Sequence, residues 1–224
     1  MDIGSNVRMV PPPDPGSENR AAQRFALMLR TAKLIAKDGE LLCIIRDISA
    51  TGLKLKLFHC LPPERQLQLE LANGSHYSIT VVWERNSEAG MRFLKKVEVA
   101  AFMTEASPFP RRPLRLRTSL PARITAQGFK GMAVIQDISQ HGARIQSSAR
   151  LAVHQPLQLE VPGMPTLAGW VRWRRHPEYG LSFERGFKLD ELAEHAGRMI
   201  GPGRPPMLPF YRLGVEMELD RCLL

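Results

Sequence analysis

Arginine pairs spaced Arg-x-x-x-Arg occur twice in this chain of 224 residues, as Arg20 with Arg24 and as Arg111 with Arg115. A planar guanidinium forms two parallel hydrogen bonds to a phosphate group or to the O6 and N7 atoms of guanine. It also stacks on the face of a base. The spacing therefore suggests recognition of an anion or a nucleotide, although a single Arg-x-x-x-Arg also arises by chance in a basic protein.

A second polar segment, Asp-x-Ser-x-x-Gly, begins 23 residues after the second arginine in one copy and 22 in the other. Its residues are Asp47, Ser49 and Gly52 in the first copy and Asp137, Ser139 and Gly142 in the second. The carboxylate can accept from the N–H groups of guanine, the hydroxyl adds a hydrogen bond, and glycine permits positive φ or close ligand approach. Alternatively, the segment is a turn in which Asp and Ser cap backbone N–H groups. The paired recurrence favours a repeated site for a guanine nucleotide with phosphates.

The rest of the chain repeats with the same period. Residues 47–93 and 137–183 align without a gap and share 15 identities in 47 positions. The shared residues include a Leu-Gln-Leu-Glu segment, a tryptophan (Trp83 and Trp173) and a Gly-x-x-Phe segment. A repeat unit of about 90 to 100 residues predicts two domains of similar fold.

Composition is that of a globular protein, with 44% hydrophobic and 24% charged residues. The net charge is +9 and the isoelectric point is about 9.9, which favours anionic partners such as a nucleotide, nucleic acid or an anionic membrane surface. Equally, positive charge can serve solubility alone. Charge by itself therefore does not choose among these functions.

The cysteines indicate a reducing compartment. Cys43, Cys60 and Cys222 have neither CxxC spacing nor a histidine at metal-ligand spacing, and an odd number of cysteines gives no disulfide framework. Cys43 lies in an apolar run and is predicted to be a small core residue. The sequence also has no signal-peptide pattern and no apolar stretch of membrane-spanning length. We therefore expect a cytoplasmic protein with no membrane span.

Short apolar runs bounded by turn residues predict strands in both units. They lie at 41–45, 53–58, 67–71 and 77–83, and at 120–124, 132–136, 143–146, 157–161 and 167–173. Helices are predicted after Phe93 and at 186–200, where apolar residues have helical spacing. The sequence thus predicts an all-β protein of two tandem six- or seven-stranded antiparallel barrels, each followed by a C-terminal helix.

The chain divides into five segments on this interpretation. They are a flexible N-terminal segment at 1–19, a first barrel at 20–105, a linker at 106–110, a second barrel at 111–200 and a Pro-rich C-terminal tail at 201–224. Pro, Gly, Ser and Asn predominate in the first segment, which predicts flexibility there.

No pattern indicates catalysis or metal binding. The six histidines have no metal-ligand spacing, and no Gly-x-Ser-x-Gly, His-Glu-x-x-His or phosphate-loop pattern occurs. We therefore expect no catalytic residues, no metal, no cofactor and no enzyme activity. Trp83 and Trp173 lie in strand patterns and are predicted to be core residues rather than surfaces for base stacking. Strand alternation further predicts that Trp170 and Trp173 face opposite ways.

The paired motifs resemble those of the PilZ domain family, bacterial receptors for the second messenger cyclic di-GMP. The resemblance covers 20–105 and 111–200 and includes the late Gly-x-x-Phe of each unit. It implies that cyclic di-GMP is the ligand and that the binding residues are Arg20, Arg24, Asp47, Ser49, Gly52, Arg111, Arg112, Arg115, Asp137, Ser139 and Gly142. The second copy has a doubled arginine at 111–112 and Arg117 nearby, so we expect it to be the stronger site.

The resemblance also implies a mechanism, in which the arginine segment orders over the ligand and changes the arrangement of the two barrels. The expected function is a non-enzymatic cytoplasmic receptor that signals to an unidentified effector protein. One alternative is a ligand-independent protein-interaction adaptor in which one or both sites are vestigial. A weaker alternative is a basic nucleic-acid binder, but the chain lacks a stretch of interleaved basic and aromatic residues, so no nucleic acid partner is expected.

Overall fold

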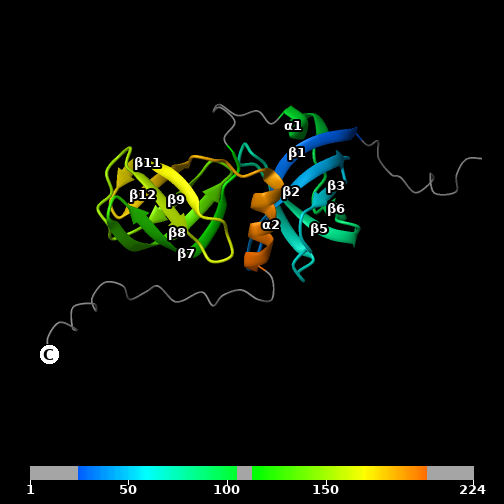
Figure 1. Cartoon of the computed structure of the whole chain (residues 1–224). Coiled ribbons are helices and arrows are strands. Elements are labelled where there is room, and N and C mark those ends of the chain that lie inside the picture. The colour runs from blue at the N-terminus through cyan, green and yellow to red at the C-terminus, as the bar shows by residue number, and fades with distance from the viewer. Residues whose placement is uncertain (1–24, 105–112, 201–224) are drawn as a thin grey trace, which may run out of the picture.

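Each half of the chain forms a closed antiparallel barrel of six strands followed by one short helix (Figure 1). The computed structural model describes residues 25–104 and 113–200, with side chains over 30–104 and 113–198. The predicted all-β architecture is confirmed, with six strands rather than seven in each barrel. The N-terminal segment, the linker and the C-terminal tail lie outside the described residues.

The two barrels have the same topology. The first consists of β1 (Phe25–Ala36), β2 (Gly39–Ile48), β3 (Gly52–Leu57), β4 (Gln66–Glu70), β5 (His76–Arg85) and β6 (Glu88–Phe93), followed by α1 (Val99–Thr104). The second consists of β7 (Leu116–Ala126), β8 (Phe129–Ser139), β9 (Gly142–Gln146), β10 (Pro156–Glu160), β11 (Leu167–Arg175) and β12 (Glu178–Phe183), followed by α2 (Leu189–Ile200). The strand order around the first barrel is β1-β2-β3-β6-β5-β4, and β7 to β12 follow the same order. Pairing of β1 with β4, and of β7 with β10, closes each barrel.

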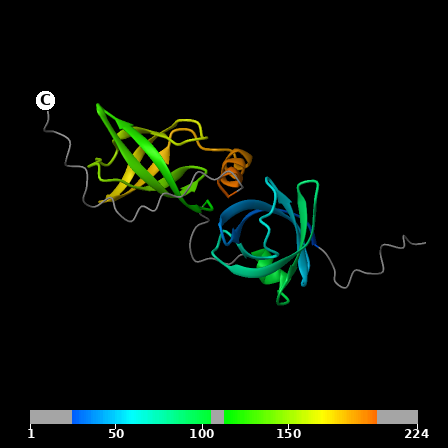
Figure 2. The same ribbon diagram turned by 90° about the horizontal axis from the view of Figure 1, so that it is seen from below.

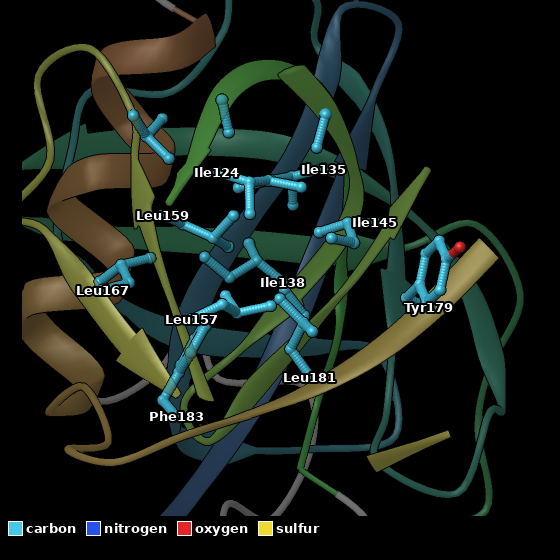
Figure 3. Packing of buried hydrophobic residues seen from close by; sticks show 14 of the residues in the cluster. Ile124, Ile135, Ile138, Ile145, Leu157, Leu159, Leu167, Tyr179, Leu181 and Phe183 are labelled. Atoms are coloured by element: carbon cyan, nitrogen blue, oxygen red, sulfur yellow. The ribbon is translucent and has the colours of Figure 1, made fainter. Parts of the chain in front are cut away.

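Alternation along the strands fills the interior of each barrel with apolar side chains. In β3, for example, Leu53, Leu55 and Leu57 are buried while the lysines between them point outward. Figure 3 shows the corresponding interior of the second barrel, where isoleucines and leucines of neighbouring strands meet. Burying each such side chain stabilises the fold by about 1.5–3 kcal/mol. Cys43 is a buried core residue as predicted, and burial raises the pKa of its thiol.

Three strands were not among those predicted. β1 begins with a run of apolar residues that does not alternate with polar ones, although Ala32 and Leu34 farther along point into the core. β6 and β12 are short and contain a central glycine, a residue that lowers strand propensity. Closure of a six-stranded barrel requires all three, so tertiary pairing outweighs the weak local signal.

Bulges interrupt the alternation at equivalent levels of both barrels. In β8 the register shifts between Ile135 and Asp137, so that Gln136 is an extra residue. The same shift occurs in β11 between Val171 and Trp173, and in the matching strands of the first barrel. Because residues two apart normally share one face, each bulge turns the following residue from the core to the outer surface.

The bulge in β11 explains why the prediction for the tryptophans was wrong. Trp173 follows the bulge and is 42% exposed, and Trp170 is also exposed. Both pair at outward positions, Trp170 with Ser182 and Trp173 with Gly180, so they share the outer face rather than facing opposite ways. Trp83 in the first barrel is likewise only half-buried.

The motif glycines allow neighbouring strands to approach closely. A Cβ atom at Gly52 would lie 2.5 Å from the carbonyl oxygen of Met91, and one at Gly142 would overlap the carbonyl oxygen of Leu181. Neither glycine has a positive φ. Their type is therefore required by the pairing of β3 with β6 and of β9 with β12, which accounts for their recurrence without a ligand.

The two helices lie at different places relative to the barrels. Phe102 of α1 packs against Tyr77 and Phe93 in the core of the first barrel. In contrast, α2 lies between the two barrels (Figures 1 and 2). It buries three apolar residues, Leu192, Ala193 and Ala196, in a cluster that joins the second core to Leu42 of β2.

The close approach at Gly142 makes a stability prediction. Gly142→Ala should lower the free energy of unfolding by about 1–3 kcal/mol, because the added methyl group has to displace the backbone of β12. Chemical denaturation followed by tryptophan fluorescence measures this. Gly163→Asn is the matched control, since Gly163 has positive φ and open space around it, and asparagine tolerates that conformation. Equal stability of Gly142→Ala and the unmodified chain would contradict the assignment.

Candidate ligand-binding site

Asp137 is the buried anion on the outer face of the second barrel. It follows the bulge in β8, pairs with Arg144 of β9, and is only 8% exposed although it points away from the core. A buried carboxylate needs hydrogen-bond donors to offset the loss of hydration. Two arginines supply them.

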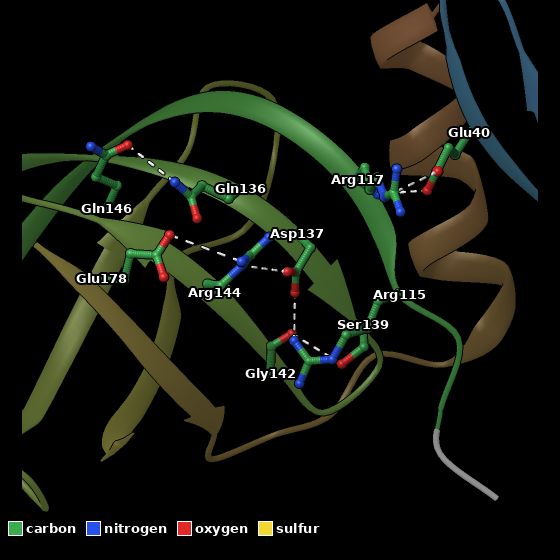
Figure 4. Close-up of polar contacts among 10 residues, drawn as sticks. All are labelled: Glu40, Arg115, Arg117, Gln136, Asp137, Ser139, Gly142, Arg144, Gln146 and Glu178. Atoms are coloured by element: carbon green, nitrogen blue, oxygen red, sulfur yellow. Dashed lines mark hydrogen bonds and ion pairs between the residues drawn. The ribbon is translucent and has the colours of Figure 1, made fainter. Parts of the chain in front are cut away.

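Arg115 and Arg144 share the Asp137 carboxylate (Figure 4). Arg115 Nη1 lies 2.5 Å from Oδ1, and Arg144 Nε lies 2.8 Å from Oδ2. Glu178 of β12 lies beyond Arg144, 3.9 Å from its Nη1. The Arg115 side chain remains 51% exposed, so much of its donor fork faces solvent. The arrangement thus presents two oriented cations around one buried anion.

The serine hydroxyls of the motif bond within the turn and do not point to the exposed face of the barrel. Ser139 Oγ donates to the carbonyl oxygen of Gly142 at 3.1 Å, and Ser49 Oγ donates to that of Gly52 at the same distance. Both serines are buried. The structure therefore divides the motif: serine and glycine form the tight connection between two strands, and aspartate holds the arginines.

Strand register extends the site across the barrel. At one level the paired residues are, in order around the barrel, Arg117 of β7, Asp137, Arg144, Gly180 of β12 and Trp173 of β11. Gly180 has no side chain, and the Trp173 indole covers it. We call this line of residues the polar row. It places an exposed aromatic ring on the outer face next to the arginines.

The first barrel has an equivalent row with different side chains. Its members are Ala26, Asp47, Lys54, Gly90 and Trp83. Lys54 replaces Arg144 and pairs with Glu88 at 2.7 Å. The guanidinium of Arg85 lies over the Trp83 ring, 5.2 Å from its centroid, and covers one face of the indole. The first row therefore has a single-point cation where the second has a fork.

A one-residue difference in strand geometry explains the unequal motif spacing. β1 and β7 each have a bulge near their beginning. The paired residues on either side of it are Ala26 and Arg30 in β1, but Arg117 and Leu120 in β7. The partners of these residues on the opposing strand have the same separation in both barrels. The extra residue in β1 accounts for 23 residues rather than 22 between the arginine and the aspartate.

The structure thus brings Arg115, Asp137, Ser139 and Gly142 together, as the sequence predicted. The first barrel likewise joins Ser49 to Gly52, with Asp47 at the position equivalent to Asp137. Four predicted arginines, Arg20, Arg24, Arg111 and Arg112, lie outside the described residues.

Sequence reasoning missed two members of the polar row. Arg144 carries a detectable signal, because a basic residue follows the motif aspartate by seven positions in both copies. For Trp173, the strand pattern of the sequence predicts a core position. Only the bulge in β11, which alternation does not reveal, places it on the surface.

Within 25–104 and 113–200, no group of three or more His, Cys, Asp or Glu side chains is arranged to hold a metal ion. In the same ranges, no helix is both long and apolar enough to cross a membrane.

Comparison with protein families identifies the two barrels. The sequence model of the PilZ domain matches residues 18–103 and again residues 109–200. Together these matches cover most of the chain, so this protein belongs to the PilZ domain family, as the sequence motifs suggested. Comparison with curated proteins gave no match.

Several solved structures are also similar to this chain. PlzA of Borreliella burgdorferi, solved in complex with c-di-GMP, is 15% identical, with 81% of this chain and 96% of that chain covered and a TM-score of 0.33. The Bacillus subtilis inhibitor of motility MotI/DgrA is 12% identical, with 77% and 96% covered and a TM-score of 0.32. MrkH of K. pneumonia in its apo state is 12% identical, with 75% and 84% covered and a TM-score of 0.31. The identities and TM-scores of these structures are low, so family membership rests on the match to the PilZ sequence model.

The turn geometry predicts that Ser139 acts on stability. Ser139→Ala should lower the free energy of unfolding by about 1–2 kcal/mol, because a buried carbonyl loses a hydrogen-bond donor. Urea titration followed by tryptophan fluorescence measures the change. Ser182→Ala is the control, since Ser182 lies on the outer face of β12 without a comparable bond among the described contacts. A Ser139→Ala variant as stable as the control would show that the cap is dispensable.

Proposed function

We propose that this protein is a non-enzymatic, cytoplasmic receptor for cyclic di-GMP, with its stronger site on the polar row of the second barrel. Membership of the PilZ family supports the ligand class. The observation that carries the proposal is the sharing of one buried carboxylate by Arg115 and Arg144 on an exposed face. No catalytic family is indicated for this chain, and the proposed activity is binding alone.

The charges of the polar row match the chemistry of the ligand. Cyclic di-GMP carries two phosphates and two guanines, and an arginine fork can bond either group through parallel N–H donors. Asp137 already accepts from Arg144 of the row and from Arg115 beside it, so its main role is to orient these two arginines. A guanidinium held in place before binding loses less side-chain entropy when the ligand arrives.

Trp173 supplies the apolar part of the proposed site. Its ring is exposed and lies one strand beyond Gly180, on the same face as Arg144. Stacking of a base on an aromatic ring contributes about 1–3 kcal/mol. The row thus offers a stacking surface and two cationic forks in sequence, which suits a flat base joined to a phosphate.

The first barrel supports the alternative role of an adaptor better than the second does. Lys54 is engaged by Glu88, and Arg85 occupies a face of Trp83 that a base would otherwise cover. We infer that the first site binds the ligand more weakly, and that this barrel contributes chiefly through contacts with protein.

Signalling is proposed to follow from ordering of the arginine segment that leads into Arg115. Arg115 itself lies at the entrance to β7, where the second barrel meets the first. Ligand held by these arginines would fix the chain between the barrels and so alter their arrangement, which an effector protein could detect.

Arg115 is the residue whose loss tests the site most sharply. Arg115→Ala should weaken binding of cyclic di-GMP at the second site by about 30- to 150-fold, the cost of one charge-assisted bidentate contact of about 2–3 kcal/mol. Arg115→Lys should restore little, because an ammonium lacks the fork. Isothermal titration of the full chain gives affinity and stoichiometry together.

Arg123→Ala is the matched control for this titration. Arg123 lies in β7, the strand that Arg115 precedes, but toward its far end, where it is exposed and pairs only loosely with Glu160 at 3.6 Å. Its removal should leave affinity unchanged. Binding by Arg115→Ala within about twofold of the unmodified chain would refute the proposed role, and absence of any binding by the unmodified chain would refute the receptor itself.

A further inference from the structure

A lysine of the first barrel is buried against the second. Lys33 of β1 points outward from its own core, yet it is only 3% exposed because the second barrel covers it. Its Nζ lies 3.0 Å from Glu40 Oε2 and 2.9 Å from Glu70 Oε2, and donates to the backbone carbonyl oxygen of Arg115 at 3.2 Å. An ammonium has three donors, and all three are used here.

Glu40 completes the contact from the neighbouring strand β2. It is 8% exposed, and its Oε2 accepts from the backbone N–H of Arg117 at 2.7 Å as well as from Lys33. The Arg117 guanidinium lies farther away, with Nε at 3.9 Å from Oε1, and is largely exposed (Figure 4). Glu40 therefore holds mainly the backbone of Arg117.

These two side chains take the place of a neighbouring strand. The carbonyl of residue 115 and the N–H of residue 117 point to the same edge of β7, as groups two residues apart do in any strand. β10 pairs with this strand only at 123–125, far from its beginning. Lys33 and Glu40 supply the donor and acceptor that this edge would otherwise lack.

The contact is built into a buried interface. Leu42 of β2, two residues beyond Glu40, is 1% exposed and belongs to the apolar cluster of the second barrel. Close to Leu42, helix α2 also contacts the first barrel: a Cβ atom at Gly197 would lie 2.7 Å from Cβ of His59. Apolar packing on one side and a desolvated ion network on the other fix where β7 begins.

We propose that Lys33 and Glu40 of the first barrel are positioning residues for Arg115 of the second. They hold the backbone on both sides of Leu116, while Asp137 holds the side chain of Arg115. The guanidinium is therefore oriented by two domains at once. This inference rests on the proposed function for its ligand, and it makes the second site dependent on the first barrel without any ligand contact from that barrel.

The test uses the full chain and removes both charges together. Lys33→Met with Glu40→Met replaces the buried pair by apolar side chains of similar length, a change that proteins often tolerate. All titrated chains carry Asp47→Ala to disable the first site. Glu70→Gln is the control, because Glu70 contacts Lys33 but no residue of the second barrel among those described. Thermal melting confirms that each variant is folded.

The double variant should bind cyclic di-GMP about tenfold more weakly, the effect of one misplaced charged contact, whereas Glu70→Gln should stay within about twofold. When Arg115→Ala is also present, the double substitution should have no further effect, because its influence passes through Arg115. A role in folding alone would instead lower affinity in both backgrounds. Unchanged affinity of the double variant would overturn the inference. So would an equally large loss of affinity when the double substitution is made in the Arg115→Ala background.

Hydrogen exchange without ligand separates this inference from the receptor proposal. The amide of Arg117 donates to Glu40, so it should exchange about tenfold faster in the folded double variant than in the unmodified chain or in Glu70→Gln. We call the contact of Lys33 and Glu40 with the backbone of residues 115 and 117 the tether. If the unmodified chain binds no cyclic di-GMP, the receptor proposal fails, while faster exchange still supports the tether. Unchanged exchange at Arg117 would overturn the tether whether or not the ligand binds.

Discussion

Closure of a six-stranded barrel restricts polar chemistry to the outer face, and bulges decide which residues reach it. Inward positions are filled mostly by apolar side chains such as leucine, isoleucine and alanine, so a carboxylate at an inward position would be buried without donors. Asp137 avoids this because Gln136 is an extra residue in β8. Equivalent bulges in β7 and β11 bring their residues to the same level. The polar row exists because these bulges coincide.

The repeat made the architecture predictable from sequence. Turn signals and gapless identity between 47–93 and 137–183 predicted two similar barrels, and the two helices followed from helical spacing. The arginine and Asp-x-Ser-x-x-Gly motifs located four residues of the second candidate site that the structure brings together. These features are local, or repeat at a fixed distance, so sequence reasoning can detect them.

The remaining features depend on register and on contacts between distant segments. Trp173 was assigned to the core because alternation does not show the bulge that turns it outward. The tether of Lys33 and Glu40 to the backbone at 115–117 joins residues about eighty positions apart and involves main-chain groups, which have no sequence signature. The strand β1 was not predicted, because polar and apolar residues do not alternate regularly along its sequence.

The two barrels show how a duplicated surface can diverge while its fold stays constant. The Ser–Gly turn is the same in both, because it serves strand pairing. The row beside it differs, with Lys54 and a covered Trp83 in the first barrel and Arg144 and an exposed Trp173 in the second. The shared part forms the same turn contact in both barrels, and the proposed difference in ligand affinity concerns only the outer face.

The most direct test of the account is to follow the indole N–H signals of the three tryptophans by NMR during titration with cyclic di-GMP. Each belongs to a known place on a barrel, and Trp→Phe variants assign them. We expect a large, saturable shift of Trp173 at the lowest ligand concentrations, with Trp83 responding only later and GTP at matched concentration producing little change. An unmoved Trp173, or equal shifts of all three signals with either nucleotide, would contradict binding on the polar row.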